Sequence, residues 1–172
     1  MHRGYIQVYT GNGKGKTTAA LGLAVRAAGA GLRTFIAQFI KEVKCSEHAL
    51  LEELGGRITV KQYGKGLIMG RKPSPADIQA AQDGYEEVKK ILLANEYGVV
   101  ILDEANVAVH LGLITVLELL ELMAIKPKDV ELVITGRYAD QKVMDAADLV
   151  TEMREIKHYH TQGVQARRGI EK

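Results

Sequence analysis

The sequence has little cysteine, few aromatic residues and almost no net charge. Its single cysteine, Cys45, cannot form a disulfide within the chain and has no metal-ligand spacing around it, which is typical of a thiol in a reducing compartment. Lys and Arg number 23 against 21 Asp and Glu, a balance that argues against partners such as nucleic acid or a membrane surface. Aromatic residues make up 5% of the chain, too few to indicate a surface that stacks nucleobases.

Long hydrophobic runs are also missing. No apolar stretch approaches the roughly 20 residues that span a bilayer, and no charged and apolar export signal precedes the first predicted strand. We therefore expect a cytoplasmic protein. The 172 residues, 47% of them hydrophobic and 26% charged, suit one domain over residues 1–172 with a basic C-terminal tail, residues 154–172.

A glycine-rich stretch, residues 11–18, lies between a short segment that favours strand and an alanine-rich segment that favours helix. Strand, glycine-rich turn and helix, in this order, form the context of a phosphate-binding loop. The usual motif starts with a glycine where this chain has Thr10, and Gly11 can relieve the turn one position later. A glycine-rich hairpin without a ligand has no need for Gly-Lys-Thr at the head of a helix.

This phosphate loop, as we call residues 11–18, predicts binding of a nucleoside triphosphate. Its glycines let the backbone curl with the N–H groups pointing inward, and the following helix adds its positive end. Lys16 is expected to reach the β- and γ-phosphates, and the Thr17 hydroxyl to ligate Mg²⁺. The predicted nucleotide-binding residues are Gly11, Asn12, Gly13, Lys14, Gly15, Lys16, Thr17 and Thr18.

Strand and helix signals alternate along the chain. Strands are predicted at residues 4–9, 34–40, 57–63, 99–102, 131–135 and 149–153, and helices at 19–28, 47–54, 75–95, 116–123 and 140–147. The helix over 75–95 begins with Ser74 as N-cap, and its buried face is predicted to consist of Ile78, Ala81, Tyr85, Val88 and Leu92. The pattern predicts a P-loop NTPase-like α/β fold, a mostly parallel sheet of five or six strands with helices on both faces.

An acidic pair, Asp103 and Glu104, follows the apolar strand over 99–102. Such a pair can simply cap the next helix. Because Lys16 and Thr17 lie upstream, we favour a second half of the nucleotide site, with Asp103 holding Mg²⁺ directly or through water. Arg137 follows another strand at the edge where open α/β sheets bind ligands, so a phosphate contact is weighed against an ordinary surface arginine.

Two further segments of the sequence each allow two interpretations. The stretch 64–73 combines glycines, cations and the apolar triplet 67–69, which indicates either a mobile loop at a ligand site or a plain connector. The basic tail could cover an anionic ligand, although a solvated terminus is the usual explanation. His158 and His160 could share a face, but no third ligand is evident, so no zinc site is predicted.

These motifs together resemble the P-loop type of ATP:cob(I)alamin (corrinoid) adenosyltransferases. The resemblance rests on residues 10–20, on Leu102-Asp103-Glu104, on residues 134–137 and above all on the ending Gly-Val-Gln-Ala-Arg-Arg-Gly-Ile-Glu over 163–171. It implies that Co(I) of a reduced corrinoid attacks the 5′ carbon of ATP and displaces triphosphate. Lys16, Asp103 and Glu104 are then the catalytic residues, with Mg²⁺, or Mn²⁺, on Thr17 and Asp103.

The resemblance also carries expectations about partners. It implies a flavoprotein reductant, a homodimer and a role in cobalamin biosynthesis or salvage. Family members often place bulky aromatic residues after the third strand, whereas this chain has Leu67 and Met69 there, which we expect to line an apolar corrinoid-binding face. The rival interpretations are a P-loop ATPase or small-molecule kinase, which releases ADP, and a module that binds ATP without turnover.

Overall fold

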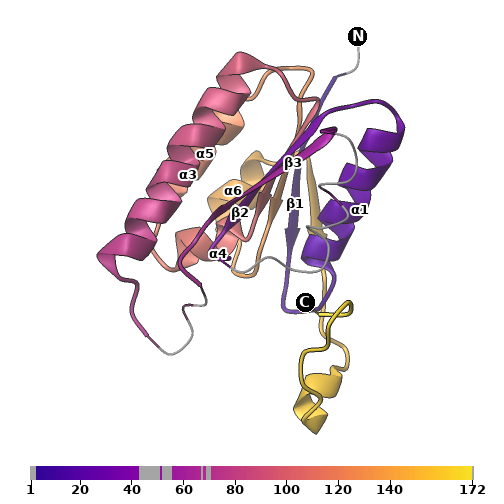
Figure 1. Ribbon diagram of the computed structural model, residues 1–172. Coiled ribbons are helices and arrows are strands. Elements are labelled where there is room, and N and C mark those ends of the chain that lie inside the picture. Colours follow the sequence, from indigo (N-terminus) through magenta and orange to yellow (C-terminus); the bar gives the residue numbers. More distant parts are fainter. Residues whose placement is uncertain (1–2, 43–50, 52–55, 67, 69–70, 172) are drawn as a thin grey trace.

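The computed structural model describes residues 3–42, 51, 56–66, 68 and 71–171. One six-stranded sheet runs through it, with helices on both sides (Figure 1). All its strand pairs are parallel, in the order β3-β2-β4-β5-β1-β6. The elements are β1 (Ile6–Thr10), α1 (Lys16–Gly29), β2 (Thr34–Phe39), β3 (Ile58–Tyr63), α3 (Pro75–Ala94), β4 (Val99–Asp103), α4 (Ala105–His110), α5 (Val116–Ile125), β5 (Glu131–Thr135), α6 (Gln141–Ala146), β6 (Leu149–Glu152) and the 3₁₀ helix η1 (Tyr159–Gln162).

The predicted fold class is confirmed, and the six predicted strands are present. In the described part of the chain, helices connect β1 to β2, β3 to β4, β4 to β5 and β5 to β6, and such crossovers produce parallel strands. The helix predicted over 47–54 lies outside the described residues, apart from Leu51. Two short helices, α4 and η1, were not predicted.

Each face of the sheet has its own hydrophobic core. Alanines on α1 let this helix lie close to one face, where they meet Ile36, Ile101 and Val133. Helices α3, α4, α5 and α6 cover the other face (Figure 1), against alternating residues of the same strands, among them Phe35 and Leu102. The central strands β2 and β4 are buried along their whole length, as expected for parallel strands covered on both faces.

The start of α3 is built as predicted, with one exception. Ser74 accepts a hydrogen bond from the Asp77 N–H, Pro75 is the first helical residue, and the helix ends at Asn95 in the left-handed conformation. Ile78 was predicted to be buried but is 40% exposed. Asp77, buried and bonded to Arg71, takes the inward position one turn before Ala81, and this turns Ile78 outward.

The strand order fixes where a ligand can bind. The carboxyl ends of β1, β4 and β5 lie at one edge of the sheet, next to the N-terminus of α1, where open α/β sheets bind ligands. Strand β6 forms one side of the sheet and leads into the tail, which hangs beyond this edge (Figure 1). Among the helices of the described residues, none is long and apolar enough to cross a membrane.

Candidate functional site

The phosphate loop is held by the backbone that follows β6. Gly13 donates its N–H to the Met153 carbonyl at 2.6 Å, and the Met153 N–H donates to the Thr10 carbonyl at 2.8 Å. A Cβ on Gly13 would lie only 2.7 Å from the Met153 carbonyl oxygen and 2.8 Å from backbone atoms of Arg154. The loop therefore needs glycine at position 13, because the backbone of residues 153–154 occupies the space of a side chain.

The first turn of α1 keeps its amides available for an anion. The preceding residue, Gly15, has a φ of 119° and no side chain that could cap the helix. In the described part of α1 no acidic residue lies in the first turn either. Free N–H groups and the positive helix end together form a site for phosphate oxygens.

Lys16 lies folded against the loop. Its Nζ donates to the carbonyl oxygens of Gly11 and Gly13, both at 2.7 Å, and the residue is 7% exposed. Burial lowers the pKa of Lys16, and the nearby Arg137 lowers it further, while Glu104 opposes the shift. The ammonium is thus placed inside the loop, where a phosphate oxygen could replace the carbonyl contacts.

Asp103 is the acceptor for groups from several elements. Its Oδ1 accepts hydrogen bonds from the hydroxyls of Thr17 at 2.7 Å and Thr135 at 2.8 Å. Its Oδ2 accepts from Gln38 Nε2 at 3.2 Å and from Lys41 Nζ at 2.8 Å. The carboxylate is 1% exposed, so it reaches the site through the Thr17 hydroxyl rather than by facing it directly.

The predicted metal pair, Thr17 and Asp103, is brought together. A hydroxyl and a carboxylate are hard oxygen donors, which suit Mg²⁺ or Mn²⁺. Within the described residues no group of three or more His, Cys, Asp or Glu side chains could hold an ion by itself. The donor set therefore fits a hard divalent ion bound together with phosphates, and Thr17 and Asp103 are the residues that would hold it.

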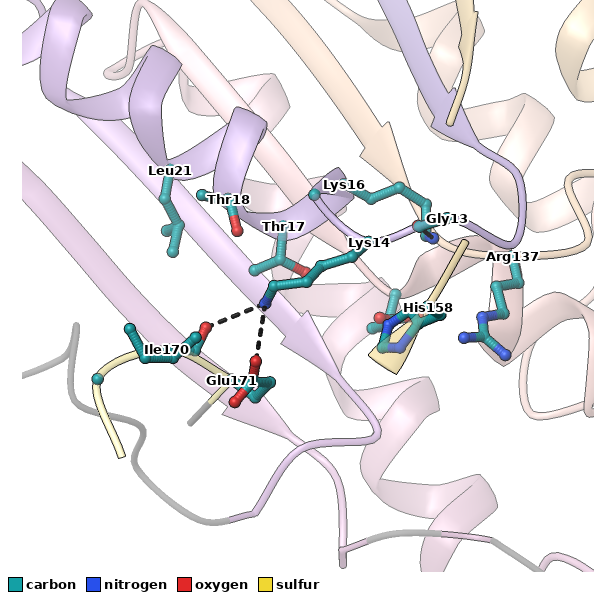
Figure 2. A pocket seen from close by; sticks show the side chains of 13 residues that line it. Gly13, Lys14, Lys16, Thr17, Thr18, Leu21, Arg137, His158, Ile170 and Glu171 are labelled. Carbon is teal, nitrogen blue, oxygen red and sulfur yellow. Dashed lines mark hydrogen bonds and ion pairs between the residues drawn. The ribbon is translucent and has the colours of Figure 1, made fainter. Parts of the chain in front are cut away.

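A pocket of about 670 Å³ opens above these groups. Figure 2 shows its side chains, with Lys14 of the loop reaching toward Ile170 and Glu171 of the tail. The lining residues are Gly13, Lys14, Gly15, Lys16, Thr17, Thr18, Leu21, Glu104, Arg137, His158, Gly169, Ile170 and Glu171. Six of the eight predicted loop residues thus face one cavity, together with Glu104 and Arg137, while Gly11 and Asn12 support the loop without lining it.

Glu104 and Arg137 are aimed by unusual backbone conformations. Glu104 has a φ of 61° and donates its N–H to the Thr135 hydroxyl at 3.0 Å. Gly136 has a φ of 129°, and a Cβ there would lie 3.1 Å from the backbone nitrogen of Val107. Burial and the Asp103 charge raise the pKa of Glu104, against the opposing effect of Lys41, Lys16 and Arg137.

The end of the tail is tied to the phosphate loop. Lys14 Nζ donates to the Ile170 carbonyl at 3.0 Å and lies 3.9 Å from a Glu171 oxygen, as the dashed lines in Figure 2 show. Glu171 also accepts a hydrogen bond from the Tyr159 hydroxyl and two from the Arg167 side chain. These bonds lower the pKa of Glu171 to about 2. Residues 158 and 169–171 of the tail therefore line the pocket, while Ile170 stays 56% exposed.

Several residues of the candidate site were missed by sequence reasoning. Gln38, Lys41 and Thr135 reach Asp103 because β2 and β5 flank β4, and only the strand order shows this. The part of the pocket wall formed by His158 had only the basic composition of the tail as a signal, whereas residues 169–171 belong to the ending that carries the family resemblance. The predicted corrinoid contacts Leu67 and Met69 lie outside the described residues.

Comparison with known proteins covers almost the whole chain. Residues 2–171 match the family model described as ATP:corrinoid adenosyltransferase BtuR/CobO/CobP. The corrinoid adenosyltransferase of Pseudomonas aeruginosa is 32% identical over 170 residues, which cover 98% of this chain and 84% of that protein. The corresponding enzyme of Escherichia coli K12 is 35% identical, and the one of Salmonella typhimurium, named CobA, is 36% identical, each over 98% of this chain and 86% of the relative.

Proposed function

The chain belongs to the ATP:corrinoid adenosyltransferase family, and from this membership we propose how its residues divide the work of adenosyl transfer. The protein is an enzyme that adenosylates a corrinoid with ATP, in cobalamin biosynthesis or salvage. The sequence motifs that form the site and the similarity to relatives over nearly the full chain both indicate this activity.

The observation that carries the mechanism is a pocket lined by groups that can bind a triphosphate. The loop residues, Lys16 and Thr17 line the pocket described above, and Asp103 holds the Thr17 hydroxyl from below. In the reaction, Co(I) of the corrinoid donates an electron pair to the 5′ carbon of ATP, and a cobalt–carbon bond forms. The bond between that carbon and the α-phosphate oxygen breaks, and the triphosphate leaves with its electron pair.

The chain's task is therefore to stabilise the negative charge that grows on the leaving group. Lys16 and Arg137 supply positive charge, and the amides of the loop supply preorganised donors. Thr17 and Asp103 would hold Mg²⁺ or Mn²⁺, which supplies further positive charge to the triphosphate when bound. Glu104 lines the same pocket and would add a carboxylate at the site of that ion. Co(I) is already a strong nucleophile, so the mechanism requires no side chain as a general base.

The remaining roles extend the proposal. The resemblance supports a flavoprotein that delivers the electron for Co(I) and a homodimer. Exposed apolar side chains on the outer strand β6, Leu149 and Val150, are consistent with a partner surface there. Leu67 and Met69 remain the proposed corrinoid contacts, and the cytoplasmic location stays a prediction.

The variant Lys16→Ala tests the leaving-group role. We expect kcat for adenosyl transfer to fall by about 100-fold or more, because a preorganised charge on the transition state is lost. The assay is anaerobic formation of the light-sensitive adenosylcorrinoid from ATP, Mg²⁺ and chemically reduced cobalamin, with thermal unfolding as a check on the fold. Lys90→Ala is the matched control, since Lys90 is exposed on α3 beside a different groove. Wild-type transfer by Lys16→Ala would overturn the assignment.

A further inference from the structure

His158 is among the pocket side chains that have no role in the mechanism above. His158 comes from the tail, half-buried, and lines the pocket together with the phosphate loop. We propose that His158 acts as a neutral hydrogen-bond donor, through Nε2–H, to the triphosphate of the nucleotide. This inference rests on the proposed function, because it assigns the residue to the same leaving group.

The tautomer of His158 is set by the backbone. The His160 N–H donates to His158 Nδ1 at 3.0 Å as the chain enters η1. A nitrogen that accepts a hydrogen bond cannot carry the proton in the neutral ring, so the proton lies on Nε2. Among the residues that the structure describes, none forms a hydrogen bond with Nε2. A donor is therefore held ready on a ring that faces the pocket.

The ring is also held in place by its neighbours. It packs against Tyr159 with the ring centroids 4.8 Å apart, and Tyr159 is bonded to Glu171 through its hydroxyl. Arg167 lies 5.1 Å above the Tyr159 ring and pairs with the same glutamate. Because Glu171 and Ile170 are tied to Lys14 of the phosphate loop, the tail that carries His158 is fixed to the wall opposite that loop.

The chemistry of the pocket favours a phosphate rather than the nucleoside as the partner of His158. Lys14, Lys16 and Arg137 line the same cavity as His158 (Figure 2). Burial lowers the pKa of Lys16 and the charge of Arg137 lowers it further, so these two cations of the pocket oppose one another. A neutral N–H adds a donor to the growing oxyanion without adding to that repulsion.

Substitution of His158 separates a donor from a packing role. Glutamine can place its amide nitrogen near the position of Nε2, whereas asparagine places it near Nδ1, away from the phosphates. We expect His158→Ala and His158→Asn to lower kcat by about 10- to 100-fold and His158→Gln to stay within about threefold of the wild type. His160→Ala is the control, because it keeps the backbone N–H that binds Nδ1 and removes only an exposed side chain.

Binding measurements identify the part of the nucleotide involved. With inorganic tripolyphosphate as the probe in calorimetry, we expect Kd to rise by about 10-fold in His158→Ala and to change little in His158→Gln. With adenosine as the probe, no variant should differ from the wild type. In ¹⁵N NMR of histidine-labelled protein, the His158 signals should show the neutral ring protonated on Nε2.

These experiments distinguish a failure of the inference about His158 from a failure of the proposed function. If the wild type forms triphosphate and His158→Ala matches it in kcat and in tripolyphosphate affinity, the inference fails and the proposed function stands. A change confined to adenosine binding, loss in His158→Gln equal to that in His158→Ala, or a ring protonated on Nδ1 would each overturn it too. If the wild type forms no triphosphate at all, the proposed function itself fails.

Discussion

At the scale of single residues, Asp103 explains how the site is ordered before a ligand binds. Four side chains donate to its two oxygens, and they come from the start of α1, from β2, from the segment after β2 and from β5. A buried carboxylate needs such partners, since burying it without them is costly. The result is that the Thr17 hydroxyl is fixed at the floor of the pocket.

Among the described residues, Glu104 lacks such a set of partners for its charged form. Burial raises the pKa of its carboxyl, and the neighbouring Asp103 charge raises it further. In the unfolded chain this carboxyl ionises near its ordinary value of 4.5. Between that value and the raised native one, the unfolded state releases its proton while the native state retains it. The free energy of unfolding therefore falls as the pH rises through this interval, and the loss persists above it.

The variant Glu104→Gln should remove this pH dependence. We expect its Tm, without nucleotide, to approach that of the wild type below about pH 4 and to rise relative to it toward neutral pH, because glutamine never ionises. The measurement is a series of thermal melts from pH 4 to 8, with Glu86→Gln, an exposed position on α3, as control. A constant difference in Tm across the series would show that Glu104 does not titrate in this way.

A site residue could be predicted from the sequence when its partners lie close to it along the chain. Lys16 and Thr17 belong to one local motif, and Asp103 follows a strand that its apolar pattern marks clearly. Lys41 and Thr135 have no such local motif, and they act only because two strands far apart in sequence flank β4. The role of His158 depends on a backbone bond to Nδ1 that composition does not reveal.

At the scale of elements, the strands were predictable because buried parallel strands are continuous apolar runs. The long helix α3 was predictable from its cap and its 3.6-residue period. Helix α4 was missed because six residues are too few to show that period, and because the acidic pair before it was interpreted as a ligand site. The conformation of the phosphate loop depends on β6, whose continuation at Met153 packs against it.

Two glycines with different surroundings, Gly13 in the phosphate loop and Gly22 in α1, test this packing. Gly13→Ala should lower adenosyl transfer by about 100-fold, because the new Cβ meets backbone atoms of residues 153 and 154 and must displace the loop by a fraction of an ångström or more. Gly22→Ala, within α1, meets nothing within 4 Å and should raise the free energy of unfolding by about 0.5–1 kcal/mol.

The two variants are compared by steady-state transfer rates and by urea unfolding. Gly22→Ala is expected to keep full activity, so it controls for the effect of a methyl group in the same segment of the chain. Unchanged transfer by Gly13→Ala would mean that the loop is not held by the backbone after β6.

At the scale of the whole molecule, the sheet brings together groups that the sequence keeps apart. The order β3-β2-β4-β5-β1-β6 places β5 between the strands that carry the phosphate loop and Asp103, and Thr17 bridges that gap. The chain then returns, so that Ile170 and Glu171 meet Lys14 across almost the full length of the sequence. One pocket is thus built from both ends of the chain and its middle.

The central claim is that this pocket stabilises triphosphate as a single leaving group. The most direct measurement is ³¹P NMR of the products after anaerobic incubation of the wild type with ATP, Mg²⁺ and reduced cobalamin in the dark, alongside the absorption spectrum of the corrinoid. We predict one equivalent of inorganic triphosphate for each light-sensitive adenosylcorrinoid formed. ADP and phosphate, with an unchanged corrinoid spectrum, would contradict the account and point to an ATPase or a kinase.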